Sequence, residues 1–463
     1  MRSPSSTSWS SYLQLRRRVS RCCALAVVVG TWAAHAQDVT IPPSILLPNY
    51  DRVYPGLNEA LEGGAYIARA RNAPAVFYNP AGIALTDRTV LNASAQGYQL
   101  TTLGGTGFDQ SSPISSFEAI PSFLGVVLGR EVIDWEAVRL GFAVVTPVHW
   151  DQSAIASTVV SPAERASYSV HSNFSTLTPT FSAGWAVSPS FRLGASIEFP
   201  YTTVSDEGKL SAEITDTTGS QGTIRTLAVN GSTLDLVGVI GLQWEALSWL
   251  QLGLVYRSPG LKINSKGSFQ YEALTTLLPS GSRQAFISDP SAQFEYRSPM
   301  EVSMGVAVEF GAVQIEADIR WHDGSHTYDV LSSTQEGRLV NTSTGTPAVS
   351  SFGFAGVPYK ARQIWNGSVG AHFTLSPTLS LSVGSYLDQS PADAVSKGFR
   401  RVDLIGFRTG VAFKIGKLDA SVGVGWEHGT APDDLAPSGP IPSESAELSL
   451  NTFTLLFSVG FKF

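Results

Sequence analysis

The sequence predicts an all-β protein, a transmembrane antiparallel β-barrel of about 14 strands with an N-terminal hatch folded inside it. Three observations support this prediction. Polar and apolar residues alternate over most of the chain from residue 88, short and long connections take turns, and the chain ends on an alternating aromatic run. Charged residues make up only 15% of the 463 residues, below the roughly 25% usual for globular domains. A helical membrane protein is excluded, because after the N-terminal region the sequence has no run of about 18 apolar residues.

Residues 1–36 are predicted to be a secretory signal peptide. Four arginines between positions 16 and 21 precede an apolar run at 22–34, and Ala34-His35-Ala36 fits a small-x-small cleavage site. Both cysteines of the chain, Cys22 and Cys23, lie in this segment, so the mature chain has no thiol for a disulfide or a metal site. The net charge is already −7 with these arginines included. So acidic a chain argues against nucleic acid as a partner.

Residues 37–87 form the predicted hatch. They do not alternate, and they contain a short helix-permissive stretch at 56–68 followed by Phe77-Tyr78-Asn79-Pro80-Ala81-Gly82. A closed barrel of about 14 strands is too wide to be filled by the side chains of its own wall. A leading segment folded inside the barrel would fill that space.

The barrel itself is predicted over residues 88–463. In the segment 313–321, for example, the odd positions are apolar and the even positions are polar or charged. Such alternation also occurs in soluble β-sandwiches, so connection lengths must decide between the two folds. Short connections at 188–189, 246–248, 311–312, 376–377 and 416–417 take turns with long polar ones, as in an up-and-down bacterial barrel. The long connections, predicted to be loops, are 149–171, 206–231, 259–299, 322–361, 389–402 and 428–447.

Fourteen strands are predicted from this pattern, and the last of them carries the sharpest local signal. It places large apolar side chains at alternate positions from Phe453 to the terminal Phe463. Unpaired backbone groups facing lipid cost several kcal/mol each, so this strand must pair with the first one. The predicted strands begin near Val90, Ile120, Val138, Asn173, Ser190, Thr233, Ser248, Glu301, Val313, Gln363, Thr378, Asp403, Lys417 and Leu448.

Several motifs resemble the FadL/TodX-type outer-membrane transporters of long-chain fatty acids and other hydrophobic compounds. The Phe77–Gly82 stretch resembles the family's hatch, and Ala119-Ile120-Pro121-Ser122-Phe123 resembles the start of its second strand. Gly253-Leu254-Val255-Tyr256-Arg257-Ser258 resembles its Gly-x-x-Tyr-Arg-Ser stretch, and residues 384–391 resemble its Gly-x-x-Tyr-Asp-x-Ser-Pro motif. One departure is Asn72-Ala73-Pro74, where the family usually has Asp-Ala-Ser.

The resemblance implies passive transport across the outer membrane by loop capture, lumenal binding, hatch movement and lateral exit through a kink in strand three. It also implies a multi-pass protein among outer-membrane lipid and lipopolysaccharide, inserted by the barrel-assembly machinery, acting as a monomer and without a cofactor. Asn79, Pro80 and Ala81 are the predicted hatch motif, and Gly141 and Pro147 the predicted kink. The predicted ligand contacts are Ile45, Leu46, Leu47, Leu261, Ile263, Phe269 and Leu277, with Arg257, Lys262 and Lys266 as contacts for a carboxylate.

Other functions remain open at this point. Some secretion systems use accessory barrels of the same architecture, and a general porin would share the barrel without the hatch. An enzyme is the remaining class, and His322-Asp323-Gly324-Ser325-His326 is the cluster that mixes His, Asp and Ser. Proximity in sequence is not triad geometry, and an exposed loop explains this cluster better. We therefore predict no enzymatic activity and no metal site.

Overall fold

The computed structural model describes residues 47–463 except 52, 106–109, 112–113, 117–119, 162, 217–218, 344, 355, 394–395, 397–400 and 432–447. The predicted signal peptide, the first part of the predicted hatch, and Ile45 and Leu46 lie outside the described residues. None of the helices in the described part is long and apolar enough to cross a membrane.

Fourteen consecutive antiparallel strands close into a barrel, as predicted. The ring closes where β1 pairs with β24, from Val90 opposite Lys462 onward, and the backbone N–H of Phe463 donates to the Thr89 carbonyl. The wall strands are β1 (Val90–Gly105), β4 (Ile120–Leu128), β5 (Val138–Ser161), β6 (Glu164–Ala186), β7 (Phe191–Glu198), β9 (Gly219–Leu247), β10 (Leu250–Arg257), β14 (Glu301–Phe310), β15 (Val313–His322), β20 (Ile364–Ser376), β21 (Leu379–Asp388), β22 (Asp403–Ile415), β23 (Leu418–Ala431) and β24 (Leu448–Lys462).

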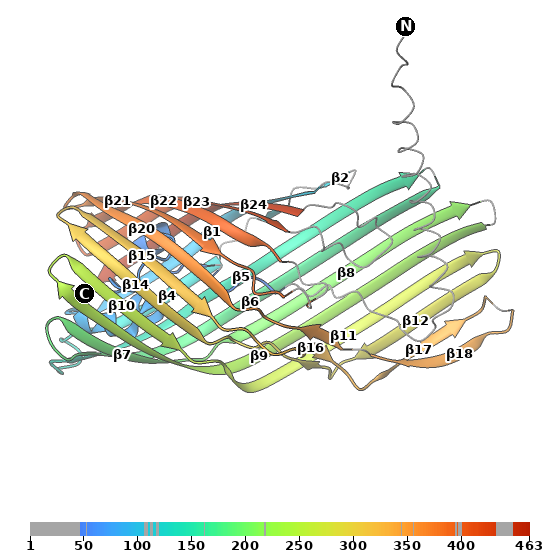
Figure 1. The fold of residues 1–463 in the computed structure, drawn as a ribbon, viewed down its shortest axis with the longest axis horizontal. Helices are drawn as coiled ribbons and strands as arrows, with labels where there is room; N and C mark the ends of the chain where they lie inside the picture. The colour runs from blue at the N-terminus through green and yellow to red at the C-terminus, as the bar shows by residue number, and fades with distance from the viewer. Residues whose placement is uncertain are drawn as a thin grey trace, which may run out of the picture. The chain divides into compact units, whose positions relative to one another are not determined.

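Most predicted strand starts agree with these bounds to within two residues, but three predicted loops are wrong. The segments 149–171, 206–231 and 259–299 are largely strand, and Figure 1 shows them continuing the wall beyond the end where the interior helices lie. They are polar, yet they contain Thr and Val, which suit strands, and the backbone of each segment pairs with a neighbouring strand. For this reason β6 and β9 begin before the predicted Asn173 and Thr233. The extensions are β8 (Tyr201–Asp216), β11 (Leu261–Leu278) and β12 (Gly281–Asp289), with β17 (Glu336–Asn341) and β18 (Ala348–Gly353) inside the predicted loop 322–361.

The remaining short strands lie between or beside these hairpins. A small separate sheet joins β13 (Gln293–Phe294), β16 (Tyr328–Ser332) and β19 (Val357–Tyr359). Two further short strands, β2 (Gln110–Ser111) and β3 (Ile114–Ser116), follow β1 and pair with β5 and β1 respectively. The predicted loops 389–402 and 428–447 hold no strand among their described residues beyond the end of β23.

The outer face of the wall is apolar and the inner face is polar. In β24, Phe453 and Phe457 are about half exposed, whereas Thr452 and Ser458 are buried. A lipid-facing apolar band with a polar lumen gives this arrangement. Aromatic pairs lie at both ends of the wall, with Trp249 stacked on Phe310 at 6.4 Å between ring centroids near one end, and Trp321 6.3 Å from Trp365 near the other.

Residues 47–86, here called the interior segment, pack against the inner face of the wall. The segment contains α2 (Asn58–Leu61), α3 (Ala75–Tyr78) and the 3-10 helix η1 (Pro80–Leu85). These helices contact β5, β6, β7 and β9 on one side and β21, β22 and β23 on the other. Apolar residues of the segment, among them Val76 and Ile83, pack with Phe123, Val127 and Val145 of the wall.

Candidate functional site

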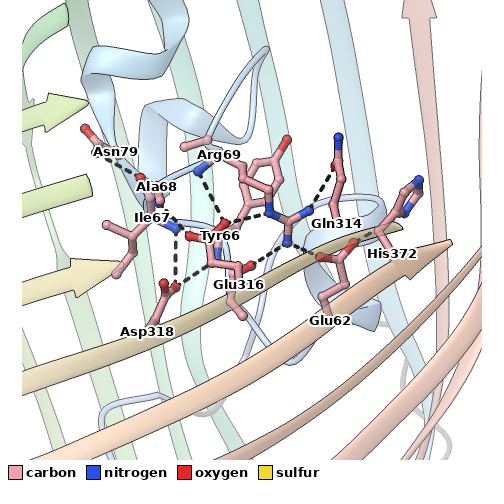
Figure 2. Close-up of polar contacts among 12 residues, drawn as sticks. Glu62, Tyr66, Ile67, Ala68, Arg69, Asn79, Gln314, Glu316, Asp318 and His372 are labelled. Atoms are coloured by element: carbon pink, nitrogen blue, oxygen red, sulfur yellow. Dashed lines mark hydrogen bonds and ion pairs between the residues drawn. The ribbon is translucent and has the colours of Figure 1, made fainter. Parts of the chain in front are cut away.

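Two inward-facing carboxylates of β15 hold the interior segment by its backbone (Figure 2). Glu316 accepts hydrogen bonds from the backbone N–H groups of Ala68 at 2.5 Å and Arg69 at 3.3 Å. Asp318 accepts from the N–H groups of Tyr66 at 2.8 Å and Ile67 at 3.3 Å. Four consecutive amides thus point at two buried carboxylates, so the stretch 66–69 needs no helix or sheet partner of its own.

Arg69 links this stretch to two further strands. Its Nε donates to Glu316 at 2.7 Å, and its Nη2 pairs with Glu62. Glu62 in turn accepts from Ser382 Oγ at 3.2 Å and lies 3.5 Å from His372 Nδ1 (Figure 2). The side chains of Arg69, Glu62 and Glu316 in this network are all buried. Breaking one member would leave an uncompensated charge, which costs about 3–5 kcal/mol, so the network fixes this part of the segment.

The predicted hatch motif docks against β7 and β9. The Asn79 side chain accepts from the Ala81 N–H at 3.1 Å and donates to the carbonyls of Ile67 and Leu242, both at 3.0 Å. Pro80 opens η1, where its missing N–H costs nothing. The wall residue that faces Pro80 is Gly194. A larger residue would not fit at this position, because its Cβ would lie 2.2 Å from the Pro80 carbonyl carbon. The contact is therefore backbone against backbone.

A small cavity lies between the interior segment and strands β5, β10, β14 and β15. Its volume is about 30 Å³, the space of a single water molecule. Aromatic side chains contribute most of the lining from the segment, and charged ones most from the wall. The lining residues are Tyr50, Asp51, Val53, Tyr54, Ile67, Phe77, Tyr78, Pro147, Arg257, Glu301 and Arg320.

The wall beside this cavity is interrupted in β5. Pairing of β4 with β5 ends at Phe123 opposite Val145, and the register between β5 and β6 shifts between Val145 and Val148. Pro147 lies within the shift, and its carbonyl accepts from the Val53 N–H of the interior segment at 3.0 Å. In the described part of the chain, the next partner of β5 on this side is Ser111, opposite Ala156.

Gly141, the other residue predicted to form the kink, sits in unbroken pairing between β4 and β6. A Cβ at this position would lie 2.7 Å from Val76 Cγ2, so the glycine makes room for the interior segment. The structure therefore places the interruption at Pro147 and a close packing contact at Gly141.

The predicted ligand residues of β11 do not converge on one site. Leu261 and Ile263 are more than half exposed, Phe269 is buried 4.4 Å from the ring of Phe354, and Leu277 is half-buried. Because they lie along a single strand, Leu261 and Leu277 are separated by about 50 Å. The fifth described ligand candidate, Leu47, is buried in the interior segment.

The three predicted carboxylate contacts have different surroundings. Arg257 lines the cavity and is paired with Glu198 and Glu301. Lys262 is exposed on β11, with its Nζ 3.4 Å from Glu295, and Lys266 is exposed further along the same strand. The cavity residues that sequence reasoning missed are the aromatic side chains of 50–78 and the inward acids. Their signal was the density of tyrosines in a segment that does not alternate.

A closed barrel with an apolar outer band, a polar inner face and an interior segment is the architecture of a transmembrane β-barrel protein. The chain matches the family model "Outer membrane protein transport protein (OMPP1/FadL/TodX)" over residues 51–400, and it belongs to that family. It is accordingly an outer-membrane transport protein and not an enzyme. No curated protein sequence matches it.

Solved structures share the fold at low sequence identity. A Pseudomonas aeruginosa FadL homologue aligns with a TM-score of 0.54 at 14% identity, covering 91% of this chain and 100% of that one. The P. putida toluene transporter TodX gives 0.55 at 12%, covering 89% and 99%. The CymD monoaromatic hydrocarbon channel gives 0.51 at 14%, covering 88% and 97%. At these identities the similarity concerns the fold alone.

Proposed function

We propose that this protein is a passive transporter of hydrophobic small molecules, with long-chain fatty acids among the candidates, across the outer membrane. The observation that carries the proposal is the interruption of β5 at Pro147 beside an internal cavity lined by aromatic rings. An apolar solute that reaches this cavity could leave sideways into the lipid without crossing the polar lumen. Structural relatives named a toluene transporter and a monoaromatic hydrocarbon channel support this class of cargo.

In the proposed route, the solute is first captured among the outer hairpins. The exposed Leu261 and Ile263 of β11 offer apolar surface for capture. The cavity has room for one water molecule, so a solute enters only after part of the interior segment moves. Residues 47–57 are the proposed moving part, because the buried charge network holds the segment from Glu62 to Arg69. Moving them breaks the hydrogen bond from Val53 to Pro147.

Uptake by whole cells tests the proposal. A host lacking its own transporters, expressing the mature chain, should accumulate labelled toluene or labelled oleate several times faster than the same host with an empty vector. Large, steady, ion-size-limited conductance in planar bilayers would instead identify a general porin. Normal folding without uptake of either compound would point to a secretion accessory.

A further inference from the structure

The cavity has a distinct charge balance. Two guanidinium groups, Arg257 and Arg320, line it together with the carboxylates of Asp51 and Glu301. Two more carboxylates stand directly behind the arginines, with Glu198 beside Arg257 and Asp318 beside Arg320. Two carboxylates, Glu198 and Glu301, thus lie beside the single cation Arg257, and His322 lies 3.5 Å from Asp51.

Four of the five N–H donors of Arg257 are engaged by neighbouring groups. Its Nε and Nη2 donate to the two oxygens of Glu198 at 3.1 and 3.3 Å, and its Nη1 donates to Glu301 at 2.6 Å. Nη2 also donates to the Phe77 carbonyl at 3.2 Å. Both carboxylates are largely buried. Charge-assisted bonds of this kind are about twice as strong as neutral ones, so an incoming anion that binds Arg257 through two donors would have to displace a bound carboxylate.

Arg320 has fewer hydrogen bonds but is buried among three neighbouring groups. It donates to the Gly64 carbonyl, lies 3.8 Å from Asp318, and stands over the ring of Tyr54 at 5.8 Å. Its side chain is only 7% exposed. A ligand carboxylate entering the cavity would lose its hydration and face the carboxylate of Glu301, which stays on the wall when residues 47–57 move.

From this charge balance we infer the ligand class and the residues that select it. The cavity accepts an uncharged hydrophobic compound and rejects a carboxylate, and Glu198 and Glu301 set this preference by neutralising Arg257. The inference rests on the transport function proposed above and refines it. Under this inference the fatty acids of the family's range would cross only when protonated, whereas alcohols and hydrocarbons of the same length would cross freely.

A pair of ligands that differ only in the head group tests the inference. Labelled 1-decanol and decanoate are equilibrated at pH 8 with the purified mature protein in detergent, against protein-free micelles. We expect the protein to bind decanol about tenfold more tightly than decanoate, the ratio that one charged hydrogen bond represents. Equal binding of the two ligands, or tighter binding of decanoate, would overturn the inference, as would uptake without binding of either.

Variants assign the preference to particular residues. Glu301→Gln should tighten decanoate binding about tenfold and change decanol binding much less, because it removes one of the two negative charges beside Arg257 while its amide oxygen can still accept the hydrogen bond. Glu198→Gln provides the same test if the first variant folds poorly, and heat-modifiable gel mobility verifies folding. The matched control is Glu309→Gln, which removes the same charge from the same strand outside the cavity lining. The double variant Glu301→Gln with Arg257→Gln should lose the gain in decanoate binding.

Failure of the inference and failure of the proposed function give different results. If cells expressing the protein take up labelled toluene while the purified protein binds decanol and decanoate equally, transport stands and the charge selection is wrong. If the cells take up neither toluene nor oleate, transport itself is wrong whatever the binding ratio.

Discussion

At the scale of single residues, Asn79 shows how one side chain fixes the interior segment to the wall. It is fully buried and makes three hydrogen bonds to backbone groups, at Ala81, Ile67 and Leu242. The motif around it could be recognised from the sequence, because Asn before Pro and a small residue suits the start of a helical turn. Its partner on the wall could not, since Leu242 is reached only once the register of β9 is known.

Replacing Asn79 with Ala should loosen the interior segment without opening the barrel. The Leu242 and Ile67 carbonyls each lose one donor, at about 1–3 kcal/mol for a group left unpaired, although Ile67 keeps its bond from Gln243 at 3.3 Å. We expect faster amide hydrogen exchange across residues 66–86 and unchanged exchange in β20 to β24. Asn264→Ala, at an exposed position of β11, is the control and should leave both regions unchanged. Equal protection of 66–86 in the two variants would show that Asn79 does not hold the segment.

The surroundings of Arg257 could be predicted only in part from the sequence. The sequence suggested a cation available to a ligand carboxylate, whereas the structure pairs it with Glu301, directly opposite across β10 and β14. That pairing had a signal, because the last residue of one strand faces the first residue of the next when an outer hairpin joins them. Glu198 comes from β7, two strands away in the ring, and only the stagger of the wall brings it near.

At the scale of elements, alternation identified the wall strands well but misjudged where they end. Polarity alone predicts loops at stretches such as 206–231, because connections between strands are usually polar. The structure shows hairpins there, in which Thr, Ser and Val pair across β8 and β9. Outside the bilayer a strand needs no apolar face, so the contrast between faces fades while the backbone pairing continues.

The interruption in β5 gives a prediction at this scale. Pro147→Val restores a backbone N–H where β5 loses its register with β6, and should favour continuous pairing. We expect toluene uptake to fall several-fold while the amount of folded barrel stays the same. Pro179→Val is the control, because Pro179 lies in β6 and pairs in register with Val144. Unchanged uptake by the Pro147 variant would argue against exit at this point.

At the scale of the whole molecule, closure of the ring was predictable from its last strand. Phe453, Phe457 and Phe463 alternate along an edge that must be paired in lipid, and β24 does pair with β1. The position of the interior segment is harder to predict from the sequence. It depends on acids of β15 and glycines of several strands that meet only after the barrel has formed.

The terminal residue carries a prediction about assembly. Phe463 is about half exposed, so its side chain adds little to packing within the barrel. We propose that the barrel-assembly machinery recognises the β24 segment around Phe463, and we expect Phe463→Ala to lower the amount of heat-modifiable barrel in the outer membrane several-fold. Phe413→Ala removes a similarly exposed phenylalanine from β22 and should have a much smaller effect. Equal yields of the two variants would contradict a targeting role.

The long hairpins set how far the protein reaches from the cell. β5 has 24 residues, which span about 80 Å along the strand. At a tilt of about 45° this gives a height of roughly 55 Å, about 30 Å more than the apolar band of the bilayer. We propose that the mouth of the barrel opens at the level of the lipopolysaccharide sugars. A greasy molecule arriving from the medium meets protein before it has to penetrate that carbohydrate.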